Sequence, residues 1–138
     1  MQNKLFRVIF YSDGHFARFT LFISEIIWGV ALLLPGDSFS RSKTYSGMAS
    51  IAAEEVWGIF WIISGLLQAL IIQNGDYHSK KAVFFAGFNS CLWWFVVVQL
   101  YTHVWPVNAV ASGDLALALM ATWIWIRSGW TMKDERRR

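Results

Sequence analysis

The chain has 138 residues, of which 56% are hydrophobic and only 15% are charged. Soluble domains carry about 25% charged residues, so this composition excludes an ordinary water-soluble fold. Nine Trp and eleven Phe suit a lipid bilayer, where aromatic rings collect at the headgroup boundary. The net charge of +3 does not indicate nucleic-acid binding, because the basic residues flank apolar segments instead of sharing one polar surface.

The first part of the chain predicts a surface segment followed by a membrane span. Residues 1–12 mix basic and apolar side chains, as an amphipathic segment at the membrane surface does. Residues 16–34 form an apolar stretch that ends at Pro35 and Gly36. Its length fits the about 20 residues that a helix needs to cross the hydrocarbon core.

A longer connection separates this span from the next one. Residues 36–54 form the predicted outer loop, polar at first and then small and helix-prone. We expect a helical lead-in that runs continuously into the second span, at 55–73. The Asn-Gly-Asp sequence at 74–76 then predicts a tight turn.

The second half of the chain predicts two more spans. The third covers 82–101 and the fourth covers 114–130. The fourth could start at Pro106 or at Asp114, and we favour Asp114 as the helix N-cap, with the preceding apolar residues along the interface. The predicted fold class is therefore an all-α, polytopic bundle of four transmembrane helices, a single membrane domain over residues 1–138.

The basic residues predict the orientation of this bundle. With the N-terminus inside, Arg41 and Lys43 alone lie outside, and the other Lys and Arg lie in or near the cytoplasm. These ten residues are Lys4, Arg7, Arg18, Lys80, Lys81, Arg127, Lys133, Arg136, Arg137 and Arg138. The bias predicts a multi-pass protein of the bacterial inner membrane with both termini in the cytoplasm.

Glu25 is the first candidate functional residue. It lies within the first apolar stretch, where a carboxylate is costly unless it is paired or protonated, so it should face the bundle interior. One interpretation is a structural ion pair with Arg127 of the fourth span. The other is a proton- or cation-binding site.

Other polar residues in or beside the spans have simpler interpretations. Glu54 and Glu55 open the second span, where acidic side chains favour the positive end of a helix, or they form an acidic mouth that attracts cations. Gln68, Asn89 and Gln99 are expected to hydrogen-bond between helices. Small residues are expected where helices touch closely. They are Gly29, Gly58, Gly65, Gly87, Ser90, Ala118 and Thr122.

No motif in the sequence predicts an enzyme, a metal site or a cofactor. His15, His78 and His103 lie in three separate boundary regions, so they do not form a predicted metal cluster. Phosphate-binding loops and the G-x-S-x-G nucleophile motif are absent from the sequence.

The segment from Trp28 to Phe39, followed by the sequence from Glu54 to Gly58, resembles small membrane proteins encoded by bacteriophages. The resemblance covers the first two spans. It implies a holin-like, lysis-associated or host-membrane-modifying role. The charged residues 133–138 match the cytoplasmic tail of holins, whereas four spans exceed the usual number in that group.

A second likeness is to small multidrug transporters, which have four short spans and a glutamate in the first. Glu25 occupies the comparable place, and Trp61 on the second span is available to stack on a cation. The Trp-Gly sequence at 28–29 and the long outer loop depart from that family's pattern.

Three functions are therefore expected from the sequence. The first is a membrane protein that acts by assembling, as in holin-like permeabilisation or modification of a host membrane. The second is a proton-coupled small-cation or multidrug transporter, or a channel, that uses Glu25. The third is an accessory subunit or exclusion factor that binds another membrane protein. The expected partners are the lipid bilayer, further copies of the chain and a membrane-protein partner, with no nucleic acid.

Overall fold

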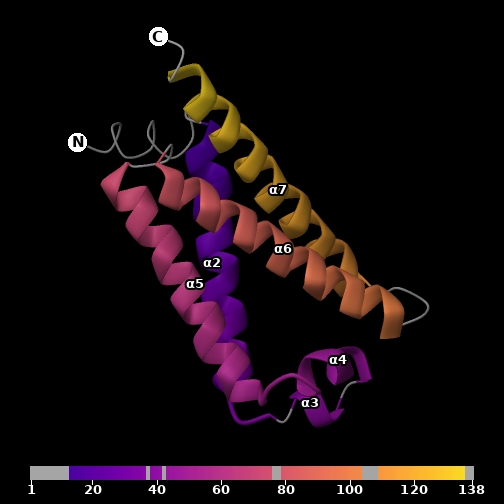
Figure 1. Ribbon diagram of the computed structural model, residues 1–138. Helices are drawn as coiled ribbons and strands as arrows, with labels where there is room; N and C mark the ends of the chain where they lie inside the picture. Colours follow the sequence, from indigo (N-terminus) through magenta and orange to yellow (C-terminus); the bar gives the residue numbers. More distant parts are fainter. Residues whose placement is uncertain (1–12, 37, 42, 76–78, 104–108, 136–138) are drawn as a thin grey trace.

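The computed structural model describes residues 13–36, 38–41, 43–75, 79–103 and 109–135. All regular structure in these ranges is helical. Four long helices dominate the fold (Figure 1): α2 Asp13–Leu33, α5 Glu54–Asn74, α6 Lys80–His103 and α7 Ala109–Glu135. Three short helical segments follow α2: α3 Ser38–Arg41, the 3₁₀ helix η1 Lys43–Tyr45 and α4 Ser46–Ala49.

The long helices form two antiparallel pairs. Helix α2 packs along α5 and helix α6 packs along α7, while α2 also contacts α7. The short segments α3, η1 and α4 lie together at one end of the bundle, and η1 and α4 pack on α6 (Figure 1). The start of α2 and the end of α7 lie at the opposite end. We call the segments α3, η1 and α4 the cap, the end of the bundle that carries them the outer end, and the opposite end the inner end.

Helices α2 and α5 touch through glycines. A Cβ atom on Gly29 would lie 2.6 Å from Cγ1 of Ile62 and 2.8 Å from the carbonyl oxygen of Gly58. A Cβ atom on Gly58 would in turn lie 3.0 Å from the carbonyl oxygen of Gly29. Since only hydrogen fits at both positions, these two residues set the closest approach of the two backbones.

The packing is inverted relative to a water-soluble protein. The buried side chains include Arg18, Glu25 and Asn89, none more than 1% exposed. The outward faces are instead apolar, for example Phe84 at 77% and Ile27 at 62% exposed. Such an arrangement is stable only where the surrounding medium is itself apolar, as in a lipid bilayer.

Three helices in the described part of the chain are long and apolar enough to cross a membrane: His15–Leu33, Glu54–Asn74 and Lys80–Thr102. They correspond to the first three predicted spans. The fourth predicted span, 114–130, lies within α7, which does not reach the same apolarity. Among the described residues there are therefore three candidate spans and not four. Charged Asp114 and Arg127 lie within the fourth predicted span and lower its mean hydropathy.

Two predicted helix boundaries are wrong. The outer loop contains the helical segments α3, η1 and α4, as expected of a helical lead-in, but it does not run continuously into α5, because α4 ends at Ala49 and Ala53 is extended, with ψ of 156°. Helix α7 starts at Ala109, so Asp114 is not its N-cap but lies one turn inside it. Asp114 is 3% exposed, so its side chain is directed into the bundle. The predicted surface segment 1–12 lies outside the described residues.

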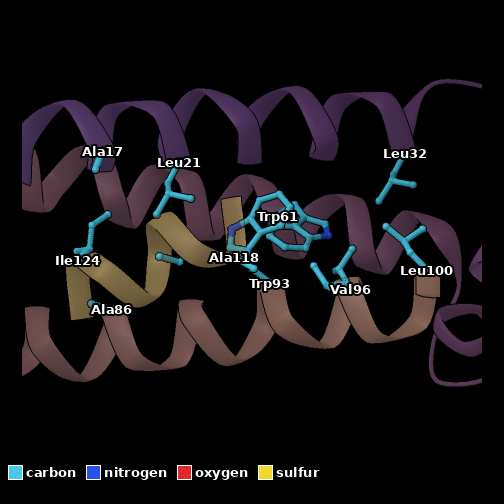
Figure 2. Packing of buried hydrophobic residues seen from close by; sticks show 12 residues of the cluster. Ala17, Leu21, Leu32, Trp61, Ala86, Trp93, Val96, Leu100, Ala118 and Ile124 are labelled. Atoms are coloured by element: carbon cyan, nitrogen blue, oxygen red, sulfur yellow. The ribbon is translucent and has the colours of Figure 1, made fainter. Parts of the chain in front are cut away.

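The apolar core is a narrow column between the helices. Figure 2 shows Trp61 and Trp93 in contact at its middle, with Leu21 and Ile124 toward the inner end and Leu100 toward the outer end. The two indole rings are 4.7 Å apart between centroids. Two large rings at the centre leave little space there, and small or aliphatic side chains fill the column on both sides.

Candidate functional site: a polar network inside the bundle

The interior face of α2 carries two ionisable residues. Arg18 and Glu25 are seven residues apart, which is two helical turns and about 10 Å of rise, so they share one face. Both are directed away from the surrounding apolar surface, with exposed fractions of 1% and 0%. Each is the centre of a separate polar layer.

The Glu25 layer joins three helices. Nδ2 of Asn89 on α6 donates a short hydrogen bond to Oε1 of Glu25 on α2. The same Nδ2 atom donates to Oγ of Ser64 on α5, at 3.1 Å. The second carboxylate oxygen of Glu25, Oε2, has no hydrogen-bond partner among the described residues. A fully buried carboxylate with a vacant acceptor is a strong site for a proton or a cation.

A layer of tryptophans covers this network on its outer side. Trp28, Trp61 and Trp93 meet with centroid distances of 6.1, 6.3 and 4.7 Å. Each lies three or four residues from the Glu25-layer residue of its own helix, so the two layers stack along the bundle axis. The indole N–H of Trp93 lies close to the Glu25 carboxylate. It does not reach hydrogen-bond geometry there.

The Arg18 layer lies on the inner side. Nη1 of Arg18 donates to Oε1 of Gln68 on α5 at 3.2 Å, and Nη2 donates to Oγ of Ser128 on α7 at 3.1 Å. The prediction counted Arg18 among the residues in or near the cytoplasm, whereas its side chain is buried inside the bundle. Its residue spacing from Glu25 places it on the interior face, whereas charge counting treats every basic residue near a span end as solvated.

Arg127 does not pair with Glu25. The neighbouring Ser128 bonds to Arg18, which places this turn of α7 in the inner layer, about 10 Å from Glu25 along the axis. Arg127 itself is half-buried and lines a surface pocket of about 220 Å³ with Trp123 and Trp130. The carboxylate of Glu25 is held by the neutral Asn89 instead.

The predicted candidates Glu54, Glu55 and Gln99 lie at the outer end of the bundle, beside the cap. Oε2 of Glu54 accepts a hydrogen bond from the backbone N–H of Phe39 at 3.2 Å, so this residue ties α3 to the start of α5. Glu55 is exposed. Gln99 lies against Gly47, where a Cβ atom would be 1.6 Å from Oε1 of Gln99. These residues are far from the Glu25 layer and form no single site with it.

The cap also contains a tyrosine whose ionisation responds to its surroundings. Tyr45 stacks on Phe39 with ring centroids 5.5 Å apart and meets Trp28 edge-on. Burial, and then the nearby carboxylates of Asp114 and Glu54, raise the pKa of the Tyr45 phenol above its ordinary value. The phenol is thus held neutral against the outer end of the core.

Sequence reasoning missed several residues of these layers. Ser64 and Ser128 are small polar residues within helices, where they are common without any special role. Trp93 is one of nine tryptophans and has no distinguishing sequence feature. The available signal was spacing: Ser64 and Gln68 are four residues apart on one helix face, as two layers of one site require.

Comparison with known proteins does not extend this description. No family model matches the sequence, and neither the curated proteins nor the solved structures contain a match. Within the described residues, no group of three or more His, Cys, Asp and Glu side chains is placed to hold a metal ion.

Proposed function

We propose that this chain is a small integral membrane protein that binds a proton, or a small cation exchanging with it, at Glu25, and that this binding is coupled to transport. The observation that carries the proposal is the fully buried carboxylate of Glu25, whose Oε2 atom has no hydrogen-bond partner among the described residues. An ionisable residue within a membrane bundle is by default a site on an ion or proton path.

The neutral partners of Glu25 support reversible protonation. Asn89 can donate to the ionised carboxylate through Nδ2, and its Oδ1 atom is also buried without a partner among the described residues. Neither it nor Ser64 carries a charge that would lock Glu25 in one state. The tight tryptophan layer leaves room for a proton or a small ion rather than a bulky substrate.

The membrane arrangement is part of the same proposal. We propose that α7 crosses the membrane as the fourth span beside α6, in a bacterial inner membrane, with both ends of the chain in the cytoplasm. The orientation rests on the remaining Lys and Arg once the buried Arg18 is left out, since only Arg41 and Lys43 lie near the outer end.

The test compares proton flux through reconstituted vesicles that contain a pH-sensitive dye. Wild-type protein should dissipate an imposed pH gradient, whereas Glu25→Gln should slow dissipation at least tenfold, because the amide cannot take up a proton. Glu55→Gln, the same change at an exposed outer position, should behave as wild type. Equal flux through both variants would reject Glu25 as the site.

Holin-like assembly is the second candidate. It is supported by the continuous apolar outer faces, such as Ile23, Ile27 and Val30 on α2, which offer contact area for further copies. Induced expression in bacteria separates the two functions. Abrupt release of a cytoplasmic reporter enzyme, equally from wild type and Glu25→Gln cells, would favour assembly into lesions over proton-coupled transport.

A further inference from the structure

A groove of about 300 Å³ lies between the inner half of α5 and the first turns of α6. Its walls are apolar: Leu67, Leu70 and Ile71 on α5 face Ala82 and Phe85 on α6. The wall on α5 extends about 10 Å along the helix to Asn74. This groove is separate from the Glu25 layer, whose residues do not line it.

The polar end of the groove lies where both helices meet the membrane surface. Asn74 is the last residue of α5, and Lys81 is the second residue of α6. Ser79 precedes α6 and its Oγ atom accepts a hydrogen bond from the backbone N–H of Ala82 at 3.1 Å. Lys81 is therefore the one charged residue among those that line the groove, and it lies at the polar end together with Asn74 and Ser79.

The groove exists because of the way α5 and α6 are spaced. Their backbones hardly approach each other, and aromatic pairs fill the space between them. The innermost pair is Phe60 with Phe88, 6.1 Å apart. Further toward the inner end α6 contributes Ala82 and Phe85 to the groove lining, and these side chains leave space open against α5. Leu67 and Leu70 consequently remain 42% and 51% exposed.

We propose that this groove binds an anionic glycerophospholipid, with an acyl chain against the apolar walls and the phosphate against Lys81. Basic pockets between membrane helices on the cytoplasmic side are suited to anionic head groups. Lys81 lies at the inner end, on the cytoplasmic side in the orientation proposed above. The lipid would fill the gap between α5 and α6 that the side chains leave open.

The experiment is native mass spectrometry of the full chain in a mild detergent, with phosphatidylglycerol or phosphatidylcholine of the same acyl chains added. Wild type should retain more phosphatidylglycerol than phosphatidylcholine. Lys81→Ala should reduce phosphatidylglycerol retention about fivefold, the effect of one lysine on an anionic lipid. Lys80→Ala removes the same charge one residue away, outside the groove lining, and should leave retention unchanged.

A second pair of variants tests the apolar walls. Leu70→Trp should obstruct the groove and lower retention of both lipids, whereas Leu66→Trp adds the same ring at an equally exposed position outside the lining. Equal losses in Lys80→Ala and Lys81→Ala, or full retention in Leu70→Trp, would overturn the proposal. A dimer peak lost only in Leu70→Trp would overturn it too, by assigning the groove to a second copy.

The proposal is independent of the role of Glu25. Glu25→Gln should retain phosphatidylglycerol as wild type does, even where it no longer conducts protons. Thermal unfolding of each variant identifies any that fails to fold. If Leu70→Trp fails, the comparison of Lys80→Ala with Lys81→Ala decides the proposal alone.

Discussion

At the scale of single residues, the bundle depends on neutral partners for buried charges. Nδ2 of Asn89 donates to both Glu25 and Ser64, whereas Gln68 and Ser128 each accept a hydrogen bond from Arg18. A buried charge that loses such a donor or acceptor is left with its full desolvation cost. The effects of substituting these residues on the free energy of unfolding should therefore be coupled.

Replacing Asn89 by Leu should lower the free energy of unfolding by about 1–3 kcal/mol, because the Glu25 carboxylate loses its donor. In the Glu25→Leu background, replacing Asn89 by Leu should lower the free energy of unfolding by less. The coupling free energy between positions 25 and 89 should be about 1 kcal/mol. Reversible unfolding in detergent micelles measures both. Cys91→Leu, at an exposed position on the same helix, should change stability by less than about 0.5 kcal/mol. Additive losses at positions 25 and 89 would contradict the coupling.

At the scale of helices, α2 and α5 pack by close backbone approach, whereas α5 and α6 are separated by aromatic rings. The first contact is set by Gly29 and Gly58. The second is set by pairs such as Trp57 with Phe95, stacked at 6.1 Å. The α2–α5 contact should therefore tolerate no added atoms, since an added Cβ would meet backbone carbonyl oxygens, which cannot rotate away, as well as the side chains of Ile62 and Leu33.

Gly29→Ala should destabilise the protein by about 1–3 kcal/mol, because the new methyl group would overlap Ile62 and the carbonyl oxygen of Gly58. Gly113→Ala on α7 is the matched control, with no atom within 4 Å of the added Cβ. Its higher helix propensity should make the control neutral or slightly stabilising. Thermal unfolding in micelles measures both, and equal effects would show that helix spacing is not the cause.

At the scale of the whole molecule, the inverted packing and the cap define two different ends. Two hydrogen bonds hold the cap against the start of α5. Glu54 accepts one from the backbone N–H of Phe39, and Nε1 of Trp57 donates the other to the carbonyl oxygen of Met48 at 3.0 Å. The inner end carries the start of α2 and the end of α7 (Figure 1). If α7 crosses the membrane as proposed, the number of crossings is even and both of these helix ends lie on one side of the membrane.

Cysteine labelling in a Cys91→Ala background tests this arrangement. A membrane-impermeant maleimide should label Ser40→Cys, in the exposed outer cap, in intact cells. It should label Lys80→Cys and a cysteine added after Arg138 only once the cells are lysed. Labelling of the C-terminal cysteine in intact cells would instead show three crossings, with α7 outside the membrane-spanning set.

The sequence alone determined the helical class, the positions of three candidate spans and the place of Glu25 within the first of them, because apolar length and charge placement report directly on a bilayer. The small size of Gly29 and Gly58 also indicated that helices touch closely there. Partners across the bundle could not be predicted in this way, because register and rotation between helices follow from packing. Only the tertiary structure showed that Arg18 is buried inside the bundle and that Glu25 hydrogen-bonds to Asn89 instead of pairing with Arg127. It alone also showed the groove beside Lys81.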